Sequence, residues 1–113
     1  MHTSKKYSDL AVYLDSGSSA QFFNQYAKSY FDMNVYAVSS TSDRQQAYCG
    51  YCTPDEIVQD KHIKTCLGDM FSSNLLEYIE RVDELNVTLG EMFTTVNISN
   101  YKSNATQKGK ISL

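Results

Sequence analysis

The sequence predicts a small α+β fold in a single domain over residues 1–113. Apolar residues recur at helical spacing in residues 18–32 and 72–85, whereas residues 34–39 and 92–99 are β-prone or alternate with a period of two. With 42% hydrophobic and 20% charged residues, the composition is that of a globular protein. A chain of 113 residues is long enough to fold around one core without stabilising disulfides or metal ions. We expect two packed layers in the approximate order α-α-β-β-α-α-β-β, followed by a loose C-terminal tail.

The first predicted element is a short amphipathic helix over residues 4–15. Its apolar side chains are spaced i, i+3, i+4, i+7, namely Tyr7, Leu10, Ala11 and Leu14. A strand over residues 10–14 is the alternative. In either case Gly17 ends the element, because glycine adopts a left-handed backbone at low cost.

The second predicted element is a helix over residues 18–32, which begins at Ser18 or Ser19. One face carries a stripe of aromatic residues, namely Phe22, Phe23, Tyr26, Tyr30 and Phe31. Such a stripe can also receive a flat ligand or a partner, but at helical spacing it favours core packing. We therefore interpret this helix as a main element of the core.

A hairpin and two helices are expected next. Residues 34–39 and 46–51 are predicted to pair as strands around a turn at residues 41–44. Thr53-Pro54-Asp55-Glu56 combines a hydroxyl cap, proline at the first helical position and acids in the first turn, and so predicts a helix over residues 54–67. The next helix is capped by Ser72 or Ser73 and reaches residue 85, with an apolar stripe along one side.

The C-terminal part is predicted to be β-structure followed by a tail. Residues 86–89 and 92–99 are the expected strands, with a turn at residues 90–91. Residues 100–113 contain three lysines and no acid, which indicates a polar, basic and partly flexible tail. A loose segment or an edge strand over residues 110–113 are the two alternatives there.

The acidic charge of the body bears on the class of partner. Net charge is −3, but residues 1–99 alone hold 7 basic and 13 acidic residues. A nucleic-acid backbone calls for a basic face, so direct nucleic-acid binding is disfavoured. Residues 55–91 hold 9 acids and 3 basic residues, and an ordinary solvated face is the favoured interpretation of this charge. The alternative is a surface for a protein partner with a basic surface. The candidate partner-binding residues are Glu77, Glu80, Asp83 and Glu84.

A cluster of cysteines and one histidine is the most specific chemical pattern. Cys49, Cys52, His62 and Cys66 form a C-x2-C-x9-H-x3-C array, which resembles small zinc fingers with two cysteines, a histidine and a third cysteine as ligands. Those fingers usually leave about twelve residues between the second cysteine and the histidine. If a helix begins at residue 54, His62 lies about 12 Å along it. That is at or beyond the distance at which the side chains of Cys52 and His62 can bind one zinc ion, so a closed site requires the helix to begin nearer Ile57. Buried structural cysteines with a surface histidine are the alternative.

Two redox readings of the same cysteines are weaker. Cys49-x-x-Cys52 resembles the redox pair of thioredoxin-like proteins, but the predicted helix begins after the second cysteine and the parallel βαβ pattern is missing. A disulfide from Cys49 or Cys52 to Cys66 is disfavoured in a reducing cytosol.

One short motif points to catalysis. Residues 14–18, Leu-Asp-Ser-Gly-Ser, resemble the active-site turn of aspartic proteases. The retroviral type has about this length and is a dimer in which each chain supplies one aspartate. The resemblance implies Asp15 as the acid of a nearly all-β homodimeric protease, whereas the helical periodicity elsewhere departs from that family. A helix stop followed by a serine cap accounts for the same residues.

These observations favour a small acidic protein-interaction module over an enzyme. We expect a regulator or inhibitor, of viral or mobile-element type, that binds a basic macromolecular partner without a cofactor; its 9 tyrosines and 5 phenylalanines leave material for an interface or a homodimer. The alternatives are a zinc-stabilised regulatory domain and, more remotely, an enzyme. No apolar stretch predicts an export signal or a membrane span, so the expected location is intracellular.

Overall fold

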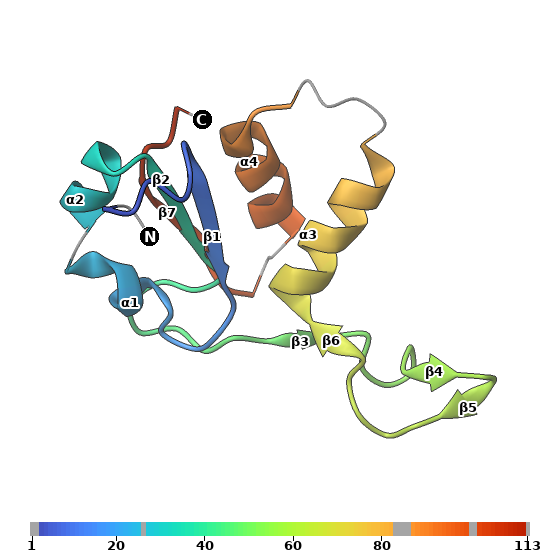
Figure 1. Ribbon diagram of the computed structural model, residues 1–113. Coiled ribbons are helices and arrows are strands. Elements are labelled where there is room, and N and C mark those ends of the chain that lie inside the picture. Colours follow the sequence, from blue (N-terminus) through green and yellow to red (C-terminus); the bar gives the residue numbers. More distant parts are fainter. Residues whose placement is uncertain (1–2, 26, 83–86, 100–101, 113) are drawn as a thin grey trace.

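A three-stranded sheet lies between two helical layers in the computed structural model (Figure 1). The structure describes residues 3–25, 27–82, 87–99 and 102–112. The helices are α1 (Ala20–Asn24), α2 (Ala27–Asp32), α3 (Met70–Arg81) and α4 (Leu89–Ser99). The strands are β1 (Leu10–Leu14), β2 (Val35–Ser39), β3 (Cys49–Gly50), β4 (Ile57–Val58), β5 (Lys61–His62), β6 (Gly68–Asp69) and β7 (Thr106–Gly109).

Strand β2 is the centre of the main sheet. It pairs in parallel with β1, from Leu10↔Val35 to Leu14↔Ser39, and antiparallel with β7. All five of its residues are buried, as expected for a strand that is covered on both faces. The crossover from β1 to β2 contains α1 and α2.

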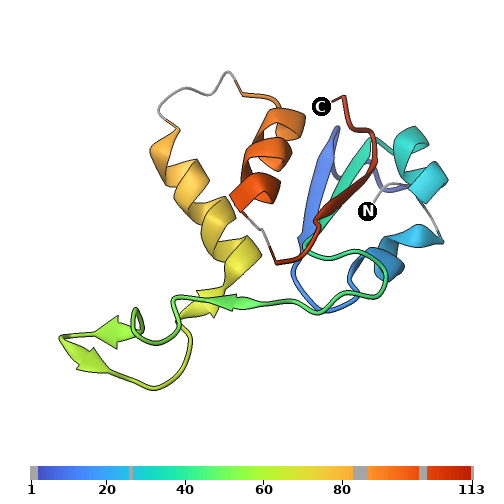
Figure 2. The same ribbon diagram turned by 180° about the vertical axis from the view of Figure 1, so that it is seen from behind.

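The main core fills the space between the sheet and the pair α3–α4. It consists of Tyr36, Val38, Phe71, Val96 and Ala105, with partly buried residues of both helices packed against it. Helices α1 and α2 cover the opposite face of the sheet, as the view from behind shows (Figure 2). Two layers were predicted, and the sheet between two helical layers makes three.

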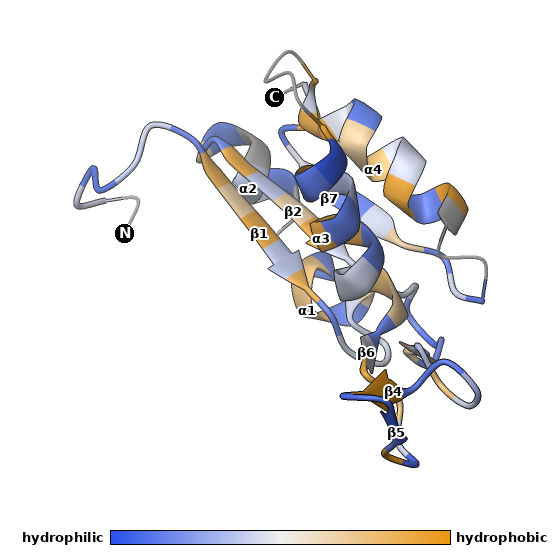
Figure 3. Ribbon diagram, turned by 90° about the vertical axis from the view of Figure 1, so that its right-hand side faces the viewer, coloured by the Kyte–Doolittle hydropathy of each residue, from blue (hydrophilic) through white to orange (hydrophobic). Residues whose placement is uncertain are grey.

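A thin arm projects from this body between β3 and α3. Its neck is the β3–β6 pair and its far end is the β4–β5 hairpin. Hydrophobic β4 stands at the exposed end of the arm, away from the core (Figure 3). The hairpin turns through Gln59 and Asp60, both with positive φ, which is the backbone of a type I′ turn.

The predicted α+β class is confirmed, but several predicted elements are wrong. Residues 10–14 form β1 and not part of a helix, so the strand alternative holds. The 54–67 helix is replaced by the arm, because its apolar residues offer no common face and Gln59, Asp60 and Lys64 adopt left-handed backbone. Residues 46–51 do not return beside β2; β3 pairs with β6 instead.

The predicted C-terminal strands are wrong as well. Residues 89–99 form α4, which a reciprocal cap starts: Thr88 N donates to Glu91 Oε2 and Glu91 N donates to Thr88 Oγ1. Residues 106–109 of the expected tail lie in the sheet as β7. The helix predicted from Ser72 is confirmed as α3, and the predicted 18–32 helix is divided into α1 and α2. Every helix in the described ranges is too short or too polar to span a membrane.

Candidate functional site

Two turns meet at one edge of the main sheet. Because β1 and β2 are parallel, the chain leaves both at the same edge, through residues 15–18 and 40–43. In α/β sheets, ligands bind outside the carboxyl ends of the strands. This edge is therefore the candidate site, and we refer to residues 15–18, 39–41 and 45–48 together as the carboxyl edge.

Buried hydroxyl groups lock the two turns together. Thr41 Oγ1 accepts from Ser19 N at 2.9 Å and donates to Ser16 O at 3.0 Å, while Thr41 N donates to Ser19 Oγ at 3.2 Å. Ser40 Oγ accepts from Ser16 N, and Ser39 Oγ lies 2.6 Å from Thr106 Oγ1. Since buried polar groups are costly unless paired, this network fixes the geometry of the edge.

Asp15 joins the carboxyl edge to helix α3. Its Oδ2 accepts hydrogen bonds from Ser72 Oγ at 2.6 Å and from Ser72 N at 3.2 Å. Ser72 N is one of the donors that the first turn of a helix leaves without a partner inside the helix, and the residue at the N-cap position, Asp69, makes no side-chain cap bond. Asp15 therefore caps α3 from a distant part of the chain.

An extended segment, residues 45–48, runs beside the first turn. Ser18 N donates to Gln45 O at 2.7 Å, and a Cβ added to Gly17 would lie 3.8 Å from Ala47 N. At the other end Met70 N donates to Tyr48 O. Between these anchors, the backbone N–H and C=O groups of Gln46 and Ala47 form no hydrogen bond with any described residue. Free peptide groups in an extended segment can pair with a further extended chain.

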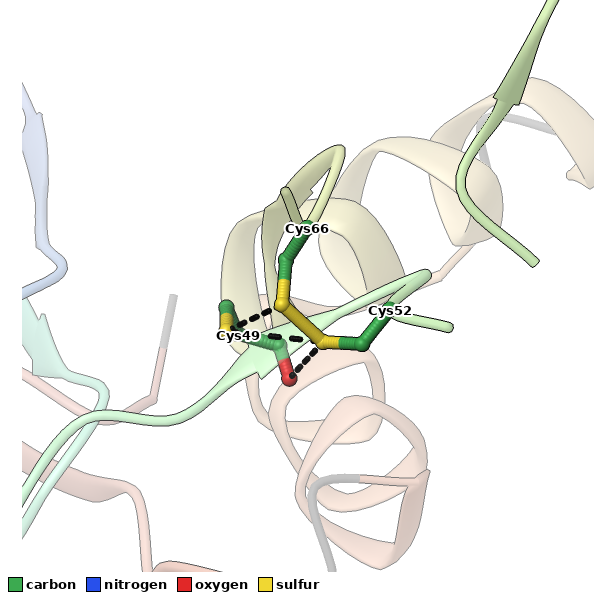
Figure 4. Close-up of a disulfide and its surroundings, with 3 residues drawn as sticks. All are labelled: Cys49, Cys52 and Cys66. Carbon is green, nitrogen blue, oxygen red and sulfur yellow. Dashed lines mark hydrogen bonds between the residues drawn. A yellow bond between two sulfur atoms is a disulfide. The ribbon is translucent and has the colours of Figure 1, made fainter. Parts of the chain in front are cut away.

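The predicted metal residues are only partly brought together. The sulfur atoms of Cys49, Cys52 and Cys66 lie within 4.8 Å of one another at the neck of the arm (Figure 4). Cys52 and Cys66 form a disulfide, contrary to the expectation for a reducing cytosol. His62 is not in this group. Zinc binding by these residues stays a prediction, and only the reduced protein would offer three thiolates.

His62 instead pairs with a carboxylate in the arm. Its Nδ1 lies 3.2 Å from Glu56 Oε1, and the Glu56 side chain is buried. Burial raises the pKa of Glu56, but hydrogen bonds from its own backbone N–H, from His62 and from Thr53 outweigh that effect and hold the pKa below its ordinary value. The pair is therefore a local fastening of the arm.

The predicted partner-binding residues lie on or after α3. Glu77 is partly exposed and bound to Tyr51 and Arg81, whereas Glu80 is exposed. Asp83 and Glu84 lie outside the described residues. Nothing in this arrangement identifies a partner, so the acidic surface stays a prediction.

Comparisons with known proteins identify a peptidase family. The sequence model of the Peptidase C13 family matches residues 1–113. The vacuolar-processing enzyme delta-isozyme of Arabidopsis thaliana is 30% identical over 96 residues, which are 85% of this chain and 20% of that protein. Hemoglobinase of Schistosoma mansoni is 30% identical over 66% of the chain and 15% of its own length, and legumain of Bos taurus is 26% identical over 100% and 24%. The chain thus spans about a fifth of the length of these relatives.

These matches overturn two predictions. An interaction module of regulator or inhibitor type is wrong, and so is the prediction that the protein is not an enzyme, because the whole chain matches a family of peptidases. The enzyme alternative is the better one, although the family is not that of the aspartic proteases which the Asp15 turn resembles. None of the short motifs identified in the sequence predicts this family, whose model matches residues 1–113. The chain belongs to the Peptidase C13 family.

Proposed function

We propose that this chain forms part of a peptidase active site and binds an extended peptide substrate along residues 45–48, beside the turn at residues 15–18. The unpaired backbone of Gln46 and Ala47 at the carboxyl edge is the observation that carries the proposal. A substrate strand placed there gains main-chain hydrogen bonds without displacing any made by these two residues. Relatives named as a hemoglobinase and as processing enzymes support a protein substrate.

The fixed geometry of the edge suits this role. Peptide cleavage depends on holding the scissile bond aligned with the reacting groups, with the reacting atoms about 3–3.5 Å apart. The paired hydroxyls of Ser19 and Thr41 anchor one side of the edge, and the bond from Met70 to Tyr48 anchors the other. The turn at Ser16 and Gly17 is exposed, so a substrate has access to it.

The described residues supply binding more clearly than bond breaking. A nucleophilic thiol or hydroxyl needs a base within hydrogen-bond reach. Across the described ranges, the histidine present, His62, is paired with Glu56 in the arm, and Cys49 is the free cysteine. We therefore assign the carboxyl edge to substrate binding and assign no nucleophile.

We also propose that the protein works in an oxidising compartment, such as an organelle lumen. The Cys52–Cys66 disulfide fits such a compartment, and two relatives are named as vacuolar enzymes.

The test combines binding and cleavage on the intact chain. Labelled unstructured peptides from globin are titrated for binding by fluorescence anisotropy, and cleavage of globin is followed by mass spectrometry. We expect saturable binding, and cleavage in addition would show that the chain also supplies the groups that break the peptide bond. Binding without cleavage would support the binding edge and contradict peptidase activity of this chain; absence of both would overturn the proposal.

A pair of variants at one position tests the edge itself. Ala47→Pro removes a backbone N–H that no described residue accepts, so the fold should persist while peptide affinity falls about tenfold, the loss expected for one hydrogen bond of about 1.4 kcal/mol. Ala47→Ser keeps the N–H and should bind like the original chain. Equal affinities of the two variants would place the peptide elsewhere.

A further inference from the structure

Three sulfur atoms meet at the neck of the arm, and only two of them are bonded. Cys49 Sγ lies 2.7 Å from Cys66 Sγ and 3.5 Å from Cys52 Sγ, beside the Cys52–Cys66 disulfide (Figure 4). Cys49 is exposed, so its side chain can turn into line with the bond. Peptide binding at residues 45–48 does not require this cluster.

Thiol–disulfide exchange needs a thiolate next to a disulfide and no other reactant. The third sulfur atom lies at van der Waals contact with Cys52 Sγ and closer than that to Cys66 Sγ, the atom that it would attack. The two possible bonds also close loops of similar length, with sequence separations of 14 for Cys52–Cys66 and 17 for Cys49–Cys66. Because closure entropy varies with the logarithm of loop length, the two loops cost nearly the same to close.

We propose that Cys66 exchanges its disulfide partner between Cys52 and Cys49. The Cys49 thiolate attacks Cys66 Sγ, the Cys49–Cys66 bond forms and the Cys52–Cys66 bond breaks. Cys52 leaves as a thiolate and takes up the proton that Cys49 lost. One thiol and one disulfide are present before and after, so the step needs no oxidant or reductant.

The exchange changes how the arm is fastened. A Cys52–Cys66 bond closes the arm beyond the β3–β6 pair, whereas a Cys49–Cys66 bond begins within β3 itself, opposite Asp69. The released Cys52 then presents its thiol on the arm. The neck is therefore a modification site at which either of two thiols can exchange with a small disulfide compound or with a disulfide of another protein, and the thiol half of that disulfide leaves.

Differential alkylation of the intact protein tests the exchange. The protein is held at pH 8 without reductant, acidified, labelled with N-ethylmaleimide and digested with chymotrypsin under non-reducing conditions. Cleavage after Tyr48 and Tyr51 separates Cys49 from Cys52. We expect label on both residues in amounts within about tenfold of each other, since isomers with similar contacts differ by no more than about 1.4 kcal/mol. Label on Cys49 alone, unchanged by hours of incubation, would overturn the proposal.

Two serine variants give an independent readout. Cys52→Ser, oxidised with glutathione disulfide, should form Cys49–Cys66 and leave no thiol that reacts with a thiol reagent. Cys49→Ser is the matched control, because it fixes Cys52–Cys66 and should show neither exchange nor a free thiol. Two reactive thiols persisting in Cys52→Ser, at an unchanged melting temperature, would show that Cys49 cannot reach Cys66 and would contradict the exchange.

Discussion

Replacing Asp15 by alanine should lower stability through helix α3. The substitution removes an acceptor for Ser72 Oγ at 2.6 Å and for Ser72 N at 3.2 Å. Loss of a helix cap costs about 0.5–2 kcal/mol, and a hydrogen bond to a charged group contributes about 1.5–3 kcal/mol. Because Asp15 is only half-buried, we expect a loss of about 2 kcal/mol in the free energy of unfolding.

Urea unfolding, followed by circular dichroism, measures this loss at constant m-value. Ser72→Ala removes only the hydroxyl bond and should cost about 1 kcal/mol. The double variant should be less destabilised than the sum of the two, with a coupling energy of about 1 kcal/mol. Asp15→Asn keeps a carbonyl acceptor and should cost about 1 kcal/mol, through lost charge at the helix N-terminus.

A chemical role of Asp15 would show a different result. The capping assignment would be refuted by two results together. Asp15→Asn would abolish globin cleavage while its free energy of unfolding stayed within about 0.3 kcal/mol of that of the original chain, and the coupling energy between Asp15→Ala and Ser72→Ala would be below about 0.3 kcal/mol. Asp15 would then be a catalytic group, as the resemblance to the aspartic protease turn implies. If cleavage falls only as stability falls, its role is structural.

Three further predictions concern the sheet, the core and the arm. Gly109→Ala should lower the free energy of unfolding in urea by more than about 2 kcal/mol, because φ is +87° and the added Cβ would clash with the backbone of β2. Gly90→Ala is the control: it lies in α4, its added Cβ would make only ordinary contacts, and it should be neutral or stabilising by up to about 1 kcal/mol. Val96→Ala removes a side chain that is 2% exposed and should cost about 1–3 kcal/mol, whereas Ile98→Ala, at 75%, should change stability by less than about 0.5 kcal/mol; equal effects would contradict the assigned core. The lowered pKa of Glu56 means that its contribution to the arm is complete above the unfolded value near 4.5 and is lost as pH falls through the lower folded value. Protection factors of the arm amides, calculated against the intrinsic exchange rate at each pH, should fall in that acid range, and Glu56→Gln should remove this fall.

The helices with one broad apolar face were predictable from the sequence. Helix α3 was found from the stripe that includes Leu75, and its observed start lies within a few residues of the predicted cap. Strand β2 was found because a central strand is a continuous β-prone run. In both elements, local preference and burial favour the same structure.

Where two periods fit the same residues, the sequence left the choice open. Residues 92–99 alternate like a strand, yet Leu89, Met92, Phe93 and Val96 also lie at helical spacing. The Thr88-x-x-Glu91 capping box was the signal that could have decided for α4. Residues 10–14 form a strand because they pair in parallel with β2, about 25 residues away in sequence. The local sequence contains no signal for such a distant pairing.

The candidate site was harder to predict than the fold. Its hydroxyl network links Ser16 and Ser19 to Thr41 across the β1–β2 crossover, so it exists only after the strands pair. The cysteines were identified from their spacing, but their disulfide was disfavoured by an assumed reducing compartment. His62 was grouped with them by a predicted helix that does not form.

The carboxyl edge and the sulfur cluster are connected by a few consecutive backbone residues. Tyr48 O accepts from Met70 N, so the end of the proposed peptide-binding segment is held by the first residue of α3. Cys49, which follows Tyr48, pairs with Asp69 in the β3–β6 neck. Asp15 accepts from Ser72 N, two residues after the start of α3. A change of disulfide partner at Cys66 therefore acts on the β3–β6 pair, and β6 continues directly into α3. The first turn of α3 is bonded both to Tyr48 and to Asp15. A two-residue strand pair has little rigidity of its own, so the covalent bond at the neck helps to set how firmly residues 45–48 are held.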